Sequence, residues 1–271
     1  MLNIKGKLLS LDKPVVMGIL NATPDSFYAD SRFQNDEAIT KRIETIITEG
    51  GALIDIGGCS TSPEATEVKP EEEWQRIEPA LKILHNNYPD IPLSVDTFRA
   101  EIAKRAVTAY GVSMINDISG GASNEKMFET VAELGVPYIL THFCDLPQPP
   151  DNNRFLEETL LYFAKKMQTL RSMGVNDVII DPGFGFGKSL EQNYILLQNL
   201  KNFTLLFDCP LLIGISRKSM IYNLLDCTPA ESLNGTTVLH TFSLLNGADI
   251  LRVHDVKEAV EVVKLVDKLK C

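Results

Sequence analysis

The chain is predicted to fold as a single (β/α)8 TIM barrel of the α/β class, with its active site at the C-terminal ends of the strands. Three observations predict this fold: eight short apolar runs, helical segments between them, and a length of 271 residues without a break in composition. Apolar runs rich in β-branched residues are typical of strands buried on both faces. Eight strand–helix repeats favour a closed barrel over an open doubly wound sheet. We therefore expect one domain, residues 1–271.

The expected strands are the apolar runs themselves, which span residues 15–21, 52–58, 92–96, 112–117, 136–142, 177–181, 210–216 and 249–254. Four of the intervening segments carry apolar residues at the spacing of one helix face. These sets are Ile39, Ile43, Ile46 and Ile47; Trp74, Ile77, Leu81 and Leu84; Ala103, Ala106, Val107 and Tyr110; and Ala259, Val262, Val263 and Val266. Residues 228–231 (Thr-Pro-Ala-Glu) predict a helix start, and Gly247 predicts a helix end.

A glycine-rich turn, "IIDPGFGFGKSLEQ", follows the sixth expected strand. It fails the phosphate-binding Walker pattern, because the first glycine of that pattern falls on Pro182. It also fails the dinucleotide pattern, in which Leu190 occupies a glycine position. Ser189 and Gln192 have the spacing of a capping box. The turn is therefore interpreted as a tight exit from a strand into a helix that begins just after Lys188.

Composition excludes several classes of protein. Twenty-six basic and thirty-six acidic side chains give a net charge of -10, which argues against a general nucleic-acid surface but leaves room for a local anion site. No apolar run approaches membrane-spanning length, and the start of the chain lacks the apolar core of a secretion signal. The five cysteines are scattered and lack metal-type spacing, as expected in a reducing cytoplasm. Cys59 and Cys144 lie near loop ends, but an ordinary small buried residue is a commoner role than a nucleophile.

The expected strand ends are unusually polar. They carry Asn21, Asp96, Asn116, Asp117, His142, Asp181, Lys218, Arg252 and His254. Each alone has a structural explanation, such as a helix cap or a solvated loop residue. A barrel, however, brings all of them to one mouth. Acids that face Lys and Arg keep one another ionised and leave directed hydrogen-bonding groups for a ligand. The set therefore predicts a binding site.

The residue types indicate what the mouth binds. Asp96 and Asp181 can each accept paired N–H donors, as an amino-pyrimidine edge offers, and Asn116 can donate and accept on the same ring. Arg252 and His254 lie two apart on a strand and point the same way, so with Asn21 they offer an anion site. A small aromatic group would be framed by Pro63, Phe186, Lys218 and Ser219. We thus expect a polar heterocycle deep in the barrel, an anion beside it and an aromatic partner at the loops.

Seven segments of the chain resemble the dihydropteroate synthase family of folate biosynthesis. They are "MGILNATPDSF", "GALIDIGGCSTSP", "LSVDTF", "MINDISGG", "IDPGFGFGK", "IGISRKS" and "GADILRVHDV", in the family's order from Met17 to Val256. The resemblance implies a pterin-binding transferase. It would condense 6-hydroxymethyl-7,8-dihydropterin pyrophosphate with p-aminobenzoate, releasing 7,8-dihydropteroate and pyrophosphate, with Mg2+. It also implies a cytoplasmic homodimer that sulfonamide drugs target.

The resemblance also implies residue roles. The implied pterin-binding residues are Asp96, Asn116, Asp181 and Lys218. Asn21 would contact the metal, and the implied pyrophosphate-binding residues are Asn21, Thr61, Arg252 and His254. The implied surroundings of p-aminobenzoate are Thr61, Pro63, Phe186, Lys218 and Ser219. The residues expected to act in catalysis are Asp96, Asp181, Lys218, Arg252 and His254, and "TPDSFYADSRFQ" would be a mobile lid.

These residue types suit a dissociative substitution through a cationic pterin methylene. Acids would stabilise the cation while cations stabilise the departing anion, and the aryl amine needs little help from a base. We expect no covalent intermediate and no catalytic triad.

Three departures from the family bear on the loops rather than on the pterin pocket. Ser62 stands where the family usually has arginine, and Arg32 is a candidate to replace that charge. The first loop is about one residue longer around Tyr28–Asp30, and "THFC" replaces a methionine-rich segment.

Two alternatives remain open. The first is a pterin-binding methyltransferase that serves a corrinoid protein, although "SRKS" and "RVHDV" have no role there. The second is a non-catalytic pterin-binding paralogue, which only Ser62 favours.

Overall fold

Eight parallel strands form the central sheet of the protein. The structure, a computed structural model, describes residues 1–271 except 5, 23–31, 60–67, 124–125, 145–151 and 270–271. The order of the strands in the sheet is β8-β7-β6-β5-β4-β3-β10-β9. Their bounds are β3 Val15–Asn21, β4 Leu53–Gly57, β5 Leu93–Asp96, β6 Met114–Asp117, β7 Tyr138–Thr141, β8 Val178–Asp181, β9 Leu212–Ile213 and β10 Ile250–Val253. Each of them falls within one of the apolar runs.

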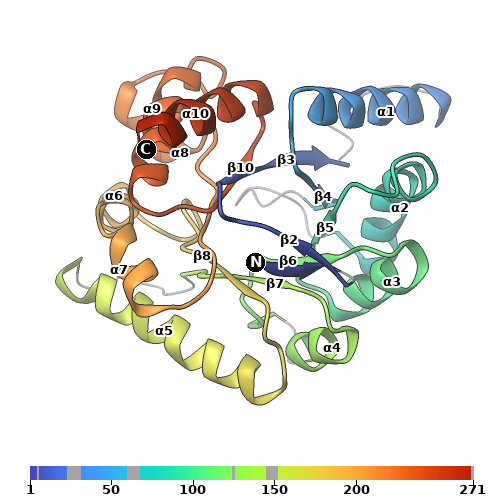
Figure 1. The fold of residues 1–271 in the computed structure, drawn as a ribbon, viewed down its shortest axis with the longest axis horizontal. Helices are drawn as coiled ribbons and strands as arrows, with labels where there is room; N and C mark the ends of the chain where they lie inside the picture. Colours follow the sequence, from blue (N-terminus) through green and yellow to red (C-terminus); the bar gives the residue numbers. More distant parts are fainter. Residues whose placement is uncertain (5, 23–31, 60–67, 124–125, 145–151, 270–271) are drawn as a thin grey trace.

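The sheet closes into a barrel between β8 and the short strand β9. A parallel bridge joins Ile180 to Leu211, and the Ile180 amide donates to the Pro210 carbonyl at 2.9 Å. β9 pairs with β10 on its other side. Helices surround this nearly closed ring (Figure 1), so the predicted (β/α)8 fold is confirmed.

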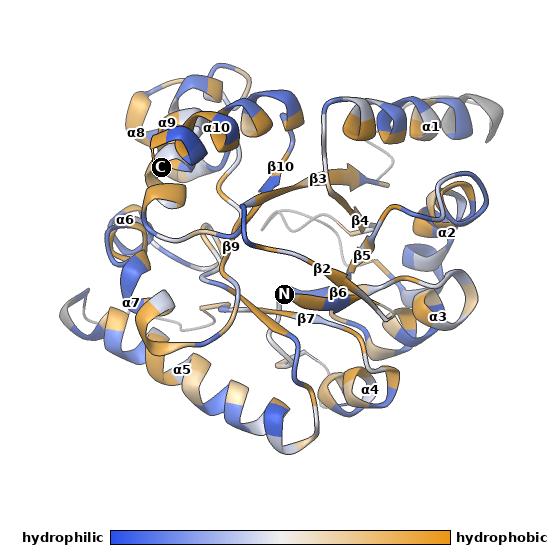
Figure 2. Cartoon of the chain, in the orientation of Figure 1, coloured by the Kyte–Doolittle hydropathy of each residue, from blue (hydrophilic) through white to orange (hydrophobic). Residues whose placement is uncertain are grey.

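The described helices cover the outside of the barrel. They are α1 Arg32–Thr48, α2 Pro70–Asn87, α3 Ala100–Tyr110, α4 Met127–Leu134, α5 Asn152–Ser172, α6 Leu190–Gln198, α7 Leu200–Leu206, α8 Ser219–Leu225, α9 Leu233–Leu245 and α10 Val256–Leu269. The strands are mostly hydrophobic, whereas the helices carry both kinds of residue (Figure 2). The predicted apolar helix faces pack on the strands in the main core. Within the described part of the chain, no helix has the length and apolarity to cross a membrane.

A hairpin that the sequence analysis did not anticipate closes the amino-terminal end of the barrel. Strands β1 (Leu2–Ile4) and β2 (Lys7–Leu9) pair antiparallel. Leu2 and Ile4 are buried in a second cluster with residues near the starts of the barrel strands: Met17, Leu53, Met114, Ile139, Ile179, Leu212 and Ile250. Figure 1 accordingly shows the amino terminus in the middle of the ring. A ligand must therefore enter the barrel from the opposite end.

The predicted helix signals were right in two places and wrong in one. Gln192 N–H donates to Ser189 Oγ at 3.2 Å and Ser189 N–H to Gln192 Oε1 at 2.9 Å, which confirms the capping box. Gly247 follows the end of α9 with φ +98°, as predicted. At residues 228–231 the Thr228 amide does donate to Glu231 Oε2 at 2.9 Å, as in a capping box, but these residues form a turn and α9 begins only at Leu233. The carbonyls of Pro229 and Ala230 in this turn accept hydrogen bonds from the Arg217 side chain.

We predict that the hairpin contributes to stability through its buried side chains. Leu2→Ala should lower the free energy of unfolding by about 2–5 kcal/mol, because Leu2 is 1% exposed and its loss leaves a cavity. Leu8→Ala is the matched control on the same hairpin, since Leu8 is 65% exposed and should change stability little. Urea unfolding measures both variants. Equal effects would contradict the proposed packing of the hairpin against the barrel.

Candidate active site

A buried network of acids and amides surrounds Arg252 inside the barrel. Arg252 Nε donates to Asp55 Oδ2 at 2.6 Å, and its Nη2 donates to Asp96 Oδ2 at 2.7 Å. Asn116 Nδ2 donates to the same Asp55 oxygen at 2.9 Å. The four residues come from β10, β4, β5 and β6. The structure thus brings three of the predicted residues together and adds Asp55 to them.

Asp55 is the functional residue that the sequence analysis missed. It lies in the middle of β4 rather than at its end, and its side chain is 0% exposed. A carboxylate within an apolar run was the available signal, because a buried charge needs a partner. Within the described residues, Asp55 Oδ1 and Asn116 Oδ1 are buried without a hydrogen-bond partner. Both atoms can accept hydrogen bonds from a ligand.

The pKa values in this network reflect both burial, which disfavours the charged forms, and the attraction between Arg252 and the acids. Burial raises the pKa of Asp96 to about 7; Arg252 opposes the rise, while Asp55, Glu73 and Asp117 add to it. Burial alone would lower the pKa of Arg252, but Asp55 and Asp96 outweigh that effect and raise it. Arg252 therefore stays charged and is the cation that permits two acids to lie close together.

A second charged pair, Asp181 and Lys218, belongs to the same mouth. Asp181 ends β8 and accepts the Gly183 amide at 2.8 Å; burial raises its pKa and Lys218 opposes this. Lys218 Nζ donates to the Phe184 carbonyl at 2.5 Å and lies 4.2 Å from the centre of the Phe186 ring. Burial lowers the pKa of Lys218 to about 8, and Asp181 counteracts it. Lys218 thus carries a proton at neutral pH beside an aromatic face.

Lys188 holds the glycine-rich turn in place. Its Nζ donates to the carbonyls of His142 and Gly183, both at 2.7 Å, and of Phe186 at 3.1 Å. Burial lowers the pKa of Lys188 to about 7. Since all three N–H groups have protein acceptors, Lys188 positions the turn instead of binding a phosphate, in agreement with the failed Walker pattern.

The glycines of the turn allow it to pass close to the end of β7. Gly183 and Gly187 have φ angles of +70° and +64°. A Cβ atom at Gly183 would collide with the His142 carbonyl oxygen, and one at Gly187 would collide with that of Cys144. The close approach explains the glycines without a nucleotide.

Two of the polar strand ends face away from the mouth. Asp117 accepts from the amides of Ser119 and Gly121 and from Tyr138 Oη, at 2.7 to 2.9 Å. The His142 ring packs against Tyr162, with ring centres 4.8 Å apart. Neighbouring residues of a strand point to opposite sides, so Asn116 faces the interior while Asp117 faces the outer layer.

The predicted anion residues lie at the mouth with different surroundings. His254 Nδ1 is 3.1 Å from Ser216 Oγ. Loss of hydration and the charge of Arg252 lower the pKa of His254 to about 4, so the ring is neutral at neutral pH and can donate a hydrogen bond. Asn21 ends β3, is exposed, and has no side-chain hydrogen bond to another described residue. Arg252 is already engaged with Asp55 and Asp96.

The predicted aromatic subsite is described only in part. Phe186 and Lys218 are in contact, and Ser219 begins α8 directly after Lys218. Thr61, Ser62, Pro63, the loop 23–31 and the side chain of Arg32 lie outside the described residues. Burial, followed by the charge of Glu73, raises the pKa of Cys59 to about 11, which argues against a thiolate nucleophile there.

We predict that Asp55 controls the protonation of Asp96. In Asp55→Asn the pKa of Asp96 should fall from about 7, because a neighbouring negative charge is lost and Arg252 is freed to pair with Asp96 alone. Between pH ~4 and ~7 the folded state holds this proton more tightly than the unfolded state, so Asp96 lowers stability as the pH rises. In Asp55→Asn, the free energy of unfolding should therefore decrease less steeply with pH over this range.

Carboxyl NMR titration measures the effect on Asp96. Asp117→Asn is the control, because Asp117 also raises the pKa of Asp96 but makes a smaller contribution and has no bond to Arg252. An unchanged pKa in Asp55→Asn would refute the coupling.

Comparisons with known proteins agree on one family. The profile described as "Pterin binding enzyme" matches residues 17–254. The dihydropteroate synthase of Escherichia coli (strain K12) is 38% identical over 269 residues, which cover 97% of this chain and 94% of that protein.

Two solved structures support the same assignment. The Xanthomonas albilineans dihydropteroate synthase with 4-aminobenzoic acid has a TM-score of 0.90 and 36% identity, over 100% of this chain and 98% of that one. The Yersinia pestis dihydropteroate synthase with a sulfonamide drug has a TM-score of 0.89 and 35% identity, over 99% and 98% of the two chains. The chain therefore belongs to the pterin-binding enzyme family and, within it, to the dihydropteroate synthases.

Proposed function

We propose that the barrel mouth condenses 6-hydroxymethyl-7,8-dihydropterin pyrophosphate with p-aminobenzoate to give 7,8-dihydropteroate and pyrophosphate. The observation that carries this proposal is the buried set of acids and cations at the carboxyl ends of the strands. It includes acceptor atoms on Asp55 and Asn116 that have no partner among the residues that the structure describes. Such atoms are costly in a folded protein unless a ligand supplies the missing donors.

The pterin ring would lie among Asp96, Asn116, Asp181 and Lys218. The amino-pyrimidine edge of a pterin offers N–H donors, and Asn116 Oδ1 is a buried acceptor without a partner in the described chain. Asn116 Nδ2 donates to Asp55 Oδ2 at 2.9 Å, so the amide oxygen is the atom of this side chain that remains for a ligand N–H. Asp181, at the end of β8, provides an acid, and Lys218, in the loop after β9, provides a charged donor.

The reaction would begin with heterolysis of the bond between the pterin methylene and the pyrophosphate oxygen. The buried carboxylates stabilise the cation that forms on the pterin, and their fixed bonds mean that they need not reorganise during the reaction. The neutral aryl amine then uses its nitrogen lone pair to form the new carbon–nitrogen bond, and the resulting ammonium gives a proton to water. No side chain forms a covalent bond in this sequence.

The departing anion would be received by Asn21 and His254, with Arg252 close behind them. His254 is neutral, because its pKa is lowered to about 4 by loss of hydration and by Arg252. It would therefore act as a hydrogen-bond donor and not as a second cation.

A Mg2+ ion fits the same corner of the mouth. Mg2+ is usually held by one or two protein oxygens together with substrate phosphates and water. Asn21 offers an exposed amide oxygen that is not engaged with another described residue, whereas the described residues include no cluster of three acids, histidines or cysteines. Asn21 would hold the ion, which would supply charge stabilisation for the pyrophosphate.

The p-aminobenzoate subsite would lie at Phe186, Lys218 and Ser219. The Lys218 ammonium over the Phe186 ring provides a flat aromatic wall and a cation for a carboxylate. The complex of one bacterial relative with 4-aminobenzoic acid, and that of another with a sulfonamide drug, support the proposal that this chain also binds p-aminobenzoate. Thr61 and Pro63 remain predictions for this subsite.

We predict that the chain releases pyrophosphate only when both substrates and Mg2+ are present. Lys218→Ala should lower kcat/KM at least about a hundredfold, since it removes a charged contact of the transition state. Its thermal midpoint should fall only modestly, because the Lys218 side chain is partly exposed and makes one hydrogen bond to another described residue, the Phe184 carbonyl. Pyrophosphate detection and thermal unfolding measure these effects.

The outcomes of this assay also separate the alternatives. Pterin binding without pyrophosphate release would favour a non-catalytic paralogue or a corrinoid-dependent methyltransferase. Full turnover by Lys218→Ala would overturn the assigned site. Lys201→Ala is a matched control, since Lys201 lies on α7 and is exposed.

We propose further that the chain forms a homodimer through α8, α9 and α10. Large apolar side chains are exposed on these three helices: Leu224, Leu225, Val238, Phe242, Leu245, Leu265 and Leu269. The helices are neighbours on one side of the barrel (Figure 1), and such a patch commonly marks an interface.

Sedimentation velocity should give about twice the chain mass of 30.1 kDa. Val238→Glu should shift the protein toward the monomer, because it places a charge in the apolar patch. Leu206→Glu, on α7, is a control that should leave the mass unchanged, although Leu206 is 62% exposed and Val238 57%. A monomer before mutation would refute the dimer.

A cytoplasmic location is also proposed. The four described cysteines, Cys59, Cys144, Cys209 and Cys227, are free thiols, which suits a reducing compartment.

A further inference from the structure

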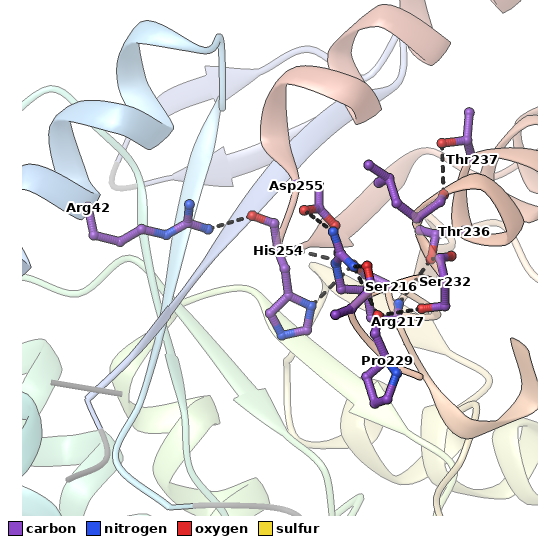
Figure 3. Close-up of polar contacts among 11 residues, drawn as sticks. Arg42, Ser216, Arg217, Pro229, Ser232, Thr236, Thr237, His254 and Asp255 are labelled. Carbon is purple, nitrogen blue, oxygen red and sulfur yellow. Dashed lines mark hydrogen bonds and ion pairs between the residues drawn. The ribbon is translucent and has the colours of Figure 1, made fainter. Parts of the chain in front are cut away.

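Two charged residues within the family-like segments have no role in the proposed reaction. Arg217 lies in "IGISRKS" and Asp255 follows His254 in "GADILRVHDV". In the structure they form a two-pronged ion pair: Arg217 Nε donates to Asp255 Oδ2 at 2.8 Å, and Nη2 donates to Oδ1 at 2.9 Å (Figure 3). Bidentate pairs of this kind fix orientation as well as distance.

The rest of the Arg217 side chain is also occupied by the protein. Its Nη1 donates to the carbonyls of Pro229 at 2.9 Å and Ala230 at 2.6 Å. The Arg217 amide donates to Thr236 Oγ1 at 3.1 Å. With Nε and both terminal nitrogens engaged, Arg217 has little capacity left for a substrate.

The backbone of Arg217 shows why so many contacts are needed. Its φ angle is +53°, a left-handed conformation that residues other than glycine adopt rarely. Such a conformation persists where surrounding contacts impose it, and it is often found at functional sites. Here it lies immediately before Lys218, so it sets the direction in which the Lys218 side chain leaves the loop.

Residues next to the ion pair join the same two loops. Ser216 Oγ accepts the His254 amide at 3.2 Å and lies 3.1 Å from His254 Nδ1. The pairs Ser216–His254 and Arg217–Asp255 therefore connect the loop after β9 to the end of β10 at two successive positions (Figure 3).

His254 is held from the other side by α1. Arg42 Nη2 donates to the His254 carbonyl at 2.7 Å (Figure 3). The same nitrogen also donates to the Ile19 carbonyl at 3.1 Å. If the ion pair were lost, the end of β10 would keep its hydrogen bond from Arg42. The loop that carries Lys218, in contrast, would lose its two-pronged contact with Asp255. The effect of breaking the pair should therefore fall mainly on Lys218 and Ser219.

We propose that Arg217 and Asp255 are positioning residues, which hold the loop carrying Lys218 and Ser219 in a fixed relation to His254. In this way the aryl amine and the departing anion would be aligned on the two sides of the reacting carbon. The proposal rests on the proposed function, and neither residue touches a reacting atom. Small losses of alignment reduce the rate of a reaction more than they reduce binding.

The test compares three variants of the full-length protein. Asp255→Asn keeps the shape of the side chain but loses its charge. Asp255→Glu retains a carboxylate that can still accept two N–H groups. Arg217→Lys retains the charge but lacks the planar fork, so it cannot replace the two-pronged contact.

The kinetic constants for the two substrates should change by different amounts, which a purely structural role would not produce. In Asp255→Asn and Arg217→Lys, kcat should fall about 10–100-fold and KM for p-aminobenzoate should rise. KM for the pterin substrate should change less than about threefold, because most of its contacts lie on other strands. Asp255→Glu should recover a large part of kcat.

Val266→Ala is the control for lost stability. Val266 lies on α10, the helix that follows Asp255, and is 2% exposed, so its truncation weakens the same helix without touching either loop. Val266→Ala should lose about as much thermal midpoint as Asp255→Asn, but its kcat should remain within about twofold of that of the unmodified protein.

Two results would overturn the proposal: full kcat in Asp255→Asn, or an equal loss of kcat in Val266→Ala. If Asp255→Asn does not fold, full kcat in Arg217→Lys or no recovery in Asp255→Glu would overturn it equally. An unmodified protein that releases no pyrophosphate would instead refute the proposed function, so the two failures are distinguishable.

Discussion

The pairing of one buried guanidinium with two buried carboxylates is the interaction on which the site depends. Removing an ion from water costs several kcal/mol, and only close, well-directed partners offset that cost. Arg252 provides them by bonding Asp55 and Asp96 at 2.6 and 2.7 Å. Without Arg252, the pKa of Asp96, which is already raised to about 7, would rise further, because Arg252 is the charge that opposes the rise. The same three residues therefore set both the shape and the charge of the mouth.

The barrel supplies the conditions for this network. Its parallel strands deliver side chains to one end, while the hairpin formed by β1 and β2 closes the other end with Leu2 and Ile4. Access and reactivity are thus confined to a single opening. Arg252, Asn116 and Lys218, which are proposed to face the ligand, are each held by a hydrogen bond to another protein group.

A second layer of contacts keeps the loops of that opening in position. Lys188 holds the glycine-rich turn through three carbonyls, and the Arg217–Asp255 pair joins the loop after β9 to the end of β10. In both cases the N–H groups of the basic side chain are bound to protein acceptors. These side chains therefore position a loop and do not bind a ligand. Prearranged groups of this kind avoid reorganisation when charge develops on a substrate, which is the main electrostatic advantage of an enzyme site.

The sequence by itself determined the eight strands, the barrel class and the polar residues at the strand ends, because the length and apolarity of each run are local properties. It could not determine which of two adjacent polar residues at the end of a strand faces the barrel interior. Asn116 and Asp117 are an example, because the strand before them is apolar on both faces. Nor could it show that Asp55 partners Arg252, since these residues are 197 positions apart. The turn before α9 likewise binds Arg217, a residue outside that helix. Only the tertiary structure decides such contacts, because they join segments whose proximity depends on the closed ring.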